Sequence, residues 1–408
     1  MDTPTSLTFN NFISLVLNSV ASNAKLLGVQ QIDLVADMYY YHSVKNCTRD
    51  ARGIGHRVLF SDSDKLPYDF STFLTNSDNK TDLNLLIAQL CTSSNIWEWE
   101  GDFRITKGMN ILSRIDSVEY EQLLTLCPDP HEEADNRMIV HIRDMLENGI
   151  KSILLRTNDS DVIVILIGFM TQFLEWDTDV KIWVDFGTGI YRKNIFINDV
   201  FEYLGESVSM GILFFHAFTG CDSTSSFFKK SKATWFKSWL SYPLYSDITP
   251  AFQCLSWLPT DEVIRQFVQN IEHFVYYVYS GKANDTLDEL RFQRFASSTN
   301  NNCFRELPPS SEALYLHIKR SAYQAGWIWG NTVTQHPCPL IQESGWLLND
   351  NILYIKWAKE LDSSKMIKLT ATCKHKHSEQ IKCVSCTCVR NTVSCLKQCS
   401  CMRKCIRH

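Results

Sequence analysis

Two carboxylates, one residue apart, follow a strongly apolar stretch of the chain. Asp159 and Asp161 stand in the sequence TNDSD, between the apolar runs SILLR and VIVILIGFM. In an extended segment, residues two apart project to the same side, so both carboxylates can point to one spot. Burying an ionised carboxylate costs several kcal/mol unless a cation or hydrogen bonds offset the cost. These acids therefore either point into solvent or converge on a cation.

Further acids occur where other predicted elements begin or end. Asp37 ends the predicted strand QIDLVAD, and Asp222 follows the apolar run GILFFHAF in FTGCDS. Glu133 and Asp135 stand at the start of a predicted helix in HEEADNR. Helical spacing would pair Glu132 with Asp135, so Glu133 and Asp135 share a direction only if the first turn is irregular.

Ligands of an open α/β sheet gather at the carboxyl ends of its strands. Converging carboxylates repel one another unless divalent cations bind between them, and oxygen-only ligands suit Mg²⁺ or Mn²⁺. Two such ions, about 3.5–4 Å apart, activate water and stabilise the leaving oxygen of a phosphodiester. The alternative is that each acid separately caps a helix or a turn. The candidate catalytic and metal-binding residues are Asp37, Glu133, Asp135, Asp159, Asp161 and Asp222.

The elements that must position these acids follow from hydrophobic periodicity and capping residues. Residues 128–149 predict a helix, with prolines before it, acids in its first turn and Asn148-Gly149 at its end. KSILLRT predicts a strand, and DVIVILIGFM predicts a second strand that is apolar on both faces, as in parallel sheets. VKIWVDFG and GILFFHAFTG continue the alternation. The expected fold class is α/β, a mainly parallel sheet flanked by helices.

Beyond about residue 240 the pattern becomes helical and aromatic. Helices are predicted within 260–280 and 308–330, and WLLNDNILYIKW predicts a hairpin. The predicted organisation is an N-terminal segment (1–30), an α/β domain (31–240), a helical extension (241–330), a hairpin connector (331–372) and a small cysteine-rich module (373–408).

Charge is unevenly distributed along the chain. The whole chain has a net charge of −5, whereas residues 374–408 hold eight Lys or Arg and one Glu, or +7, which leaves −12 for the rest (−5 − 7). A basic tail on an acidic body is typical of nucleic-acid binding, although solvated basic termini are common. Two more basic groups are candidates for phosphate contacts, with ordinary surface charge as the alternative: Lys45, Arg49 and Arg52, and Lys229, Lys230 and Lys232.

Eight of the fifteen cysteines lie near the C-terminal end, with C-x-x-C-x-C and C-x-x-x-C-x-C spacing. Without a secretory signal, this density favours thiolate ligands over disulfides, and each zinc takes four ligands. A disordered tail is the alternative. His375 and His377 are further donors. The zinc candidates are Cys373, Cys383, Cys386, Cys388, Cys395, Cys399, Cys401 and Cys405; the other seven cysteines are expected to be reduced and at least half-buried.

No membrane segment is expected. The longest apolar run, residues 162–170, is shorter than the roughly 20 residues of a bilayer span. The N-terminal residues MDTPTSLTFNNF include an acid and no basic segment, unlike a secretory signal. A nuclear or cytoplasmic location is expected.

The motifs EEAD, TNDSD and TGCDS, in that order, resemble the PIN-like flap endonuclease superfamily over residues 31–240. In that superfamily a Glu-Ala-Glu helix start, a Thr-Glu-Asp-x-Asp strand end and a Leu-Gly-Cys-Asp turn supply metal ligands. The resemblance implies a PIN-like fold and a nuclease that hydrolyses DNA or RNA, DNA being favoured. Carried over by motif, it assigns the helix start to Glu133 and Asp135, the strand end to Asp159 and Asp161, the turn to Asp222 and the first strand to Asp37.

A closer resemblance extends through most of the chain. SVKNCTR, EEADNR, NDSDV, HAFTGCDSTS and LPPSSEAL are similar to motifs of a multi-copy group of animal proteins associated with mobile elements. The tail resembles the tesmin-like CXC domain, a DNA-binding module, without its Tyr-Cys landmarks. Two departures concern the nuclease motifs: the second-strand Asp has only Asp102 and Asp116 as candidates, and FFKKSKATWFKSW replaces the glycine-rich turn. These departures favour a second hypothesis, a non-catalytic nucleic-acid or chromatin adaptor that binds through its zinc tail. A decayed mobile-element product is a third.

Overall fold

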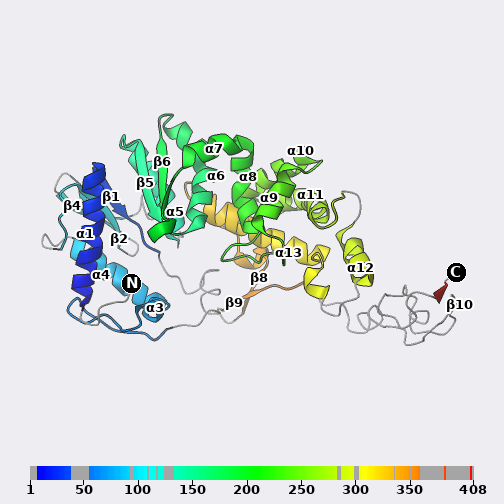
Figure 1. The fold of residues 1–408 in the computed structure, drawn as a ribbon, viewed down its shortest axis with the longest axis horizontal. Coiled ribbons are helices and arrows are strands. Elements are labelled where there is room, and N and C mark those ends of the chain that lie inside the picture. Colours follow the sequence, from blue (N-terminus) through cyan, green and yellow to red (C-terminus); the bar gives the residue numbers. More distant parts are fainter. Residues whose placement is uncertain are drawn as a thin grey trace.

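The structure is a computed structural model with a mixed α/β architecture (Figure 1). Strands and helices of the first half lie together at one end, and helices of the second half lie beside them (Figure 1). Among the described helices, none combines the length and the apolar character that a membrane span requires. The structure describes residues 7–37, 55–91, 96–107, 110–115, 118–123, 133–282, 286–297, 303–334, 336–349, 352–358, 381–382 and 405–406.

The N-terminal part forms a sheet with its own hydrophobic core. The strands β1 to β4 pair in sequence order; β1 and β2 are parallel, and the other two pairs are antiparallel. The elements are α1 (Phe9–Leu27), β1 (Gln31–Leu34), α3 (Phe70–Phe73), α4 (Ser77–Cys91), β2 (Asp102–Lys107), β3 (Asn110–Ile115) and β4 (Val118–Leu123).

Helix α1 belongs to this N-terminal core. Thr8 caps its first turn, and Gly28, with a φ of 67°, ends it in the left-handed conformation that favours glycine. Its buried residues recur every three to four positions, from Phe9 to Ala24, and pack with residues of β1, α4 and β2. The prediction of a separate segment over residues 1–30 is wrong in this respect, because the helix buries one face against the first sheet.

A second sheet follows, with the order β5-β6-β7. β5 and β6 are parallel, as the sequence predicts for KSILLRT and VKIWVDFG, and β7 is antiparallel to β6. Parallel and antiparallel pairs therefore mix within each of the two sheets, where the sequence predicted one mainly parallel sheet. The elements are α5 (Ala134–Glu147), β5 (Ser152–Thr157), α6 (Ser160–Trp176), β6 (Lys181–Phe186) and β7 (Lys193–Phe196).

Helix α6 replaces the strand that the sequence predicted for DVIVILIGFM. The run is apolar on both faces because the helix is covered on several sides, by α5, α7 and α8. Gly168 permits the close contact with α8, since a Cβ there would lie 2.9 Å from the side chain of Leu213. A short apolar run does not distinguish a buried strand from a buried helix; the Asp159 cap is the local signal that decides.

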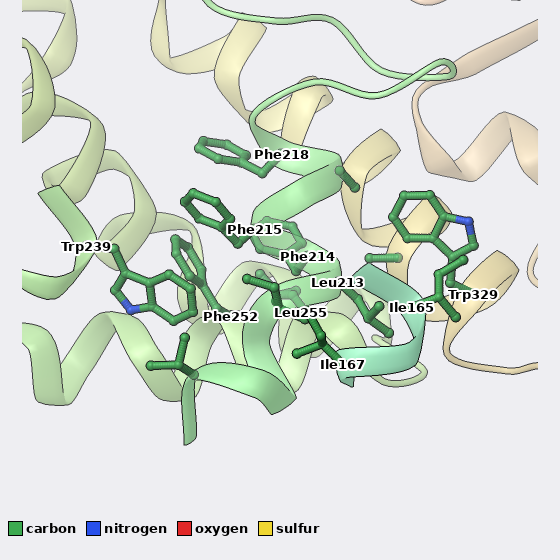
Figure 2. Close-up of a cluster of buried hydrophobic side chains, with 14 of the residues drawn as sticks. Ile165, Ile167, Leu213, Phe214, Phe215, Phe218, Trp239, Phe252, Leu255 and Trp329 are labelled. Carbon is green, nitrogen blue, oxygen red and sulfur yellow. The ribbon is translucent and has the colours of Figure 1, made fainter. Parts of the chain in front are cut away.

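The helices of the second half share one continuous core with the second sheet. Figure 2 shows Phe214, Phe215 and Phe218 of α8 beside the side chains of neighbouring helices. This core extends from Ile139 to Trp329, so the domain boundary predicted at residue 240 lies inside it. The helices are α7 (Ile197–Leu204), α8 (Glu206–Phe218), α9 (Lys232–Leu240), α10 (Tyr245–Ser256), α11 (Asp261–Ser280), α12 (Leu287–Ser297) and α13 (Ser311–Ala322), which continues as a π-helix, η3 (Tyr323–Trp329).

Two short strand pairs complete the described fold. β8 (Trp346–Asn349) and β9 (Ile352–Ile355) form the predicted hairpin. β10 (Ile381–Lys382) and β11 (Cys405–Ile406) are parallel, with Ile381 opposite Cys405. This pair brings together two points of the tail that are far apart in sequence.

Candidate functional site

Three of the predicted acids meet at the N-terminus of α5. Glu133 is the N-cap residue and has extended dihedral angles (φ −88°, ψ 135°), but its side chain makes no capping hydrogen bond. Asp37 supplies that bond instead: its Oδ1 accepts the backbone N–H of Ala134 at 2.8 Å. Asp135 lies in the first turn. Glu133 therefore precedes the helix in the extended geometry that is usual for an N-cap residue, and Asp135 is the second helical residue.

This helix terminus is a favourable place for carboxylates. Glu133 is 9% exposed and Asp135 8% exposed, so water screens them little. The positive end of a helix dipole stabilises a nearby carboxylate by about 0.3–1 kcal/mol, and by up to about 2 kcal/mol when it is partly buried. That is less than the several kcal/mol that desolvation of two acids costs, so the helix dipole alone does not offset their burial.

Arg137 supplies one cation that the sequence analysis gave no role. It lies one turn after Glu133, is 1% exposed, and donates from Nη1 to the backbone oxygen of Ala36 at 3.0 Å. This bond ties α5 to the segment that carries Asp37. The signal was present in the sequence, because the EEADNR motif ends in this arginine.

The acid pair of TNDSD lies at the N-terminus of α6. Asp159 is the N-cap residue, and its Oδ1 accepts the backbone N–H of Asp161 at 2.9 Å. The two acids are thus linked through a helix cap, and the predicted extended conformation across both residues is wrong. Asp159 is exposed, whereas the side chain of Asp161 is 20% exposed.

Asp161 also contacts a buried histidine. His216, in the last turn of α8, approaches its Oδ1 through Nε2 at 2.9 Å. Because the histidine side chain is only 9% exposed, this contact fixes the orientation of the carboxylate. The sequence analysis missed His216, although HAFTGCDSTS begins with it.

The three candidate lysines after TGCDS do not act as one cluster. Lys229 pairs with Glu306, and Lys230 donates to the backbone oxygen of Val278 at 3.0 Å. Lys232 instead donates to the backbone oxygen of His216 at 2.7 Å and to Oγ1 of Thr219 at 3.0 Å, at the end of α8 where His216 contacts Asp161.

The electrostatic surroundings of Lys232 confirm its place beside the acids. Burial lowers its pKa to about 8, while Cys221 and Asp161 act in the opposite direction. Burial also raises the pKa of Cys221, whose Sγ lies 3.1 Å from Oγ1 of Thr224. Lys232 is therefore a cation held close to Asp161, and the cysteine is a buried neutral thiol.

Asp222 lies in the turn after α8. Gly220 has a φ of 111°, and a Cβ there would lie 2.8 Å from the side chain of Ser226, so the turn needs glycine. Asp222 is exposed, and Ser223 donates from Oγ to Oε1 of Gln324 at 2.7 Å. The turn is thereby fastened to η3 with its acid facing solvent.

The helix termini share one edge of the fold. α6 begins directly after the carboxyl end of β5, and α5, which leads into the start of β5, packs against α6. Its N-terminus, with Asp37 bound to it, therefore lies toward the carboxyl end of β5. We refer to this edge, with Asp37, Glu133, Asp135, Asp159 and Asp161, as the acid edge.

The second-strand candidate Asp102 lies away from the acid edge. It begins β2 and pairs with Gln31, the first residue of the parallel strand β1, whereas Asp37 follows the other end of β1. Near that end β2 presents Thr106, which accepts the N–H of Ala36 at 2.8 Å. Asp116 lies outside the described residues.

Several other predicted site residues also lie outside the described part of the chain. Within it, no group of three or more His, Cys, Asp or Glu side chains is arranged to hold a metal ion. Cys91, Cys221, Cys254 and Cys338 are free, and Cys254 is exposed, contrary to expectation. The undescribed candidates are Lys45, Arg49, Arg52, Cys373, Cys383, Cys386, Cys388, Cys395, Cys399 and Cys401.

Comparison with known proteins gives no relatives. No protein-family model, no curated protein and no solved structure matches the chain.

Proposed function

We propose that the protein is a divalent-metal-dependent nuclease with a PIN-like arrangement of acids. The observation that supports this most strongly is the bond from Ala134 to Asp37, which joins residues 97 positions apart. It puts a third carboxylate beside Glu133 and Asp135, which are nearly buried. The cap bond and the helix dipole stabilise a single carboxylate there by only about 1 kcal/mol, so a cation-dependent role accounts best for the set of three.

The chemistry of the donors suits Mg²⁺ or Mn²⁺, although no three of the described side chains are arranged to hold an ion and binding would have to draw them together. Carboxylate oxygens are the hard ligands that these ions prefer. Asp37, Glu133 and Asp135 would hold one ion and Asp159 and Asp161 a second, with Asp222 as a further ligand. Such ions, when bound, supply Lewis-acid activation of water and of the phosphodiester.

The remaining side chains of the acid edge have supporting roles in this proposal. His216 orients Asp161 through the 2.9 Å contact. Lys232 contributes a positive charge close to that carboxylate, where a phosphate would lie. Arg137 neutralises part of the charge of the α5 acids and locks the Asp37 segment against the helix.

The test is cleavage by the purified full-length chain in Mn²⁺, with labelled single-stranded, flapped and duplex substrates. Asp135→Asn should abolish cleavage, because it removes a ligand at nearly constant volume. Asp69→Asn is the control for loss of a carboxylate elsewhere. Asp69 caps α3 as Asp37 caps α5, by accepting a backbone N–H, here that of Thr72 at 2.9 Å, and it belongs to the N-terminal unit. A folded protein that leaves every substrate uncut would refute the proposal.

One observation favours the second candidate, a non-catalytic nucleic-acid adaptor that binds through its zinc tail. Lys232 already provides an internal cation close to Asp161, and His216 contacts the same carboxylate, so Asp161 has protein partners without a metal ion. Deletion of residues 373–408 separates the two functions. A nuclease keeps metal-dependent cleavage after the deletion, whereas an adaptor loses its affinity for DNA.

A further inference from the structure

The second sheet has a face that none of the described helices covers. Inward-facing residues of β5 and β6 are buried in the core, and the alternate residues are exposed except Asp185, which is 3% exposed. Leu154 is 45% exposed and Trp183 39% exposed. α6, α7 and α8 lie on one side of β5 and β6 (Figure 1). We call the open side the outer sheet face; it comprises Ser152, Leu154, Arg156, Lys181, Trp183, Asp185, Asn194 and Phe196.

An aromatic row crosses the middle of the outer sheet face. The strand register places Leu154 opposite Trp183 and Trp183 opposite Phe196. The rings of Trp183 and Phe196 stack, with centroids 4.0 Å apart and planes 23° apart. The stack fixes the indole on one side and leaves the rest of it open to solvent. A rigid, exposed aromatic ring on a strand is a platform on which a planar base can stack.

A cationic row lies beside the aromatic one. Asp185 is opposite Arg156 and is bound both by Arg156 and, in a bidentate manner, by Arg192, at 2.7 Å from Nε and 2.5 Å from Nη2. The arginine side chains are 54% and 48% exposed, whereas the aspartate side chain is 5% exposed. One buried carboxylate thus holds two guanidinium groups at the surface. With exposed Lys181, the face has three cations against one acid.

The spacing and direction of the two rows suit an extended strand of nucleic acid. They are two residues apart along β5 and β6, or about 6.6 Å at 3.3 Å per residue. The arginine row lies at the carboxyl ends of these strands, the end at which Asp159 follows β5. The β6–β7 turn adds Ile190, 90% exposed, and Tyr191, 80% exposed, at the same end. The two arginines therefore lie between the aromatic row and the acid edge, whereas Lys181 lies at the opposite end of β6.

We propose that the outer sheet face binds single-stranded nucleic acid, with bases stacked on Trp183 and phosphates held by Arg156, Arg192 and Lys181. This assignment rests on the proposed nuclease function and names the form of its substrate: unpaired strands that run across the sheet toward the acid edge. Duplexes fit poorly, because their bases are already stacked on one another. A protein partner fits poorly as well, since the apolar part of the outer sheet face is a single row flanked by charge.

The test is photocrosslinking of the full-length chain to a bromodeoxyuridine-substituted single strand of about 12 nucleotides, in EDTA so that cleavage does not interfere. Peptide mapping of the adduct identifies the contact site even though the basic tail also attracts DNA. We expect adducts within the peptide that carries Trp183 or Tyr191. Adducts confined to other peptides, or self-association of the chain through this face in their place, would overturn the assignment.

Affinity measurements on variants give the second readout. Trp183→Ala should weaken single-strand binding roughly tenfold, the effect of losing a base stack worth about 1.4 kcal/mol. Trp357→Ala is the matched control, because Trp357 is 77% exposed beyond β9. Arg156→Gln, which leaves the core unchanged, should reduce the salt dependence by about 0.7 in log–log slope. Unchanged affinity in Trp183→Ala together with an unchanged slope in Arg156→Gln would refute the face as a binding site.

These measurements separate this assignment from the nuclease proposal. Binding in EDTA does not depend on the acids acting as metal ligands. If the outer sheet face binds and no substrate is cut, the nuclease proposal fails alone. If substrates are cut and Trp183→Ala binds and cuts like the unmodified chain, the binding face fails alone.

Discussion

Asp37 combines a structural and a proposed catalytic role, and two substitutions separate them. Asp37→Ala removes the acceptor of the Ala134 N–H, and loss of an N-cap acceptor costs about 1 kcal/mol, within a range of about 0.5–2 kcal/mol. Asp37→Asn keeps a side-chain oxygen in that place and removes a negative charge next to Glu133 and Asp135. For two unit charges about 6 Å apart, at an effective dielectric constant of about 20, the relief is up to about 3 kcal/mol. Arg137 offsets much of it, so we expect a gain of about 0–1 kcal/mol.

Both substitutions remove the charge, so the difference between them reports the lost cap acceptor: Asp37→Asn should be more stable than Asp37→Ala by about 1 kcal/mol. Thermal melts followed by circular dichroism at 222 nm, the helical signal, should resolve this as a difference of about 2 °C. Both variants should lose Mn²⁺-dependent cleavage, while the distant cap variant Asp69→Ala loses stability and keeps activity. If Asp37→Asn melts below the unmodified chain, the charge itself stabilises the fold, and the reasoning that the acids repel one another is refuted.

Three further outcomes follow from the described contacts. Asp161→Ala should cost about 1–3 kcal/mol in a denaturant titration, because it leaves the buried His216 unpaired, and the double variant with His216→Phe should recover part of that loss. Burial lowers the pKa of Lys232 to about 8, so its charge is present at about pH 7 and absent at about pH 9. Any contribution of this charge to nucleic-acid affinity in EDTA should therefore fall between these pH values, and the affinity of Lys232→Met should not change over the same interval. Burial lowers the pKa of His317 to about 4, so the unfolded chain binds more protons between pH 6.5 and 4; stability should fall as the pH falls through that window, by about 2 kcal/mol at about pH 5, and His317→Gln should remove the dependence.

The sequence predicted elements best where local signals were strong. The helix of residues 261–280 has a Thr260 cap and a Gly281 end, and the sequence Asp350-Asn351 separates the paired strands β8 and β9. It failed where burial on several sides removed the periodicity. α6 is surrounded by other helices, so its sequence has no polar face to distinguish a helix from a strand.

The candidate site shows the same limit. The acids were identifiable because carboxylates beside apolar runs are unusual. Their partners were not. His216 lies 55 residues from Asp161, and the Ala36 oxygen that Arg137 contacts lies 101 residues from it. The local sequence does not predict which group contacts which, because only tertiary packing brings these groups together.

Helix α5 is the element on which assembly of the acid edge depends. One face of it packs in the second core through residues such as Ile139 and Ile142. Another face contacts the first sheet, where Arg104 of β2 pairs with Asp144, and His141 lies 2.5 Å from Asp33 of β1. These pairs are largely buried, so breaking one leaves a buried charge behind, at a cost of about 3–5 kcal/mol.

The contact of α5 with the first sheet determines the position of Asp37. Asp37 is only three residues past the end of β1, so its position over the α5 N-terminus requires that β1 and α5 be docked. A change that separates the first sheet from α5, such as Arg104→Met, should displace Asp37 from Glu133 and Asp135 although it touches none of them. The first sheet and α5 are joined by the Arg104–Asp144 ion pair, by the contact of His141 with Asp33 and by the buried pair Ile111 and Val140, which ties any activity at the acid end of the helix to the docking of the two sheets.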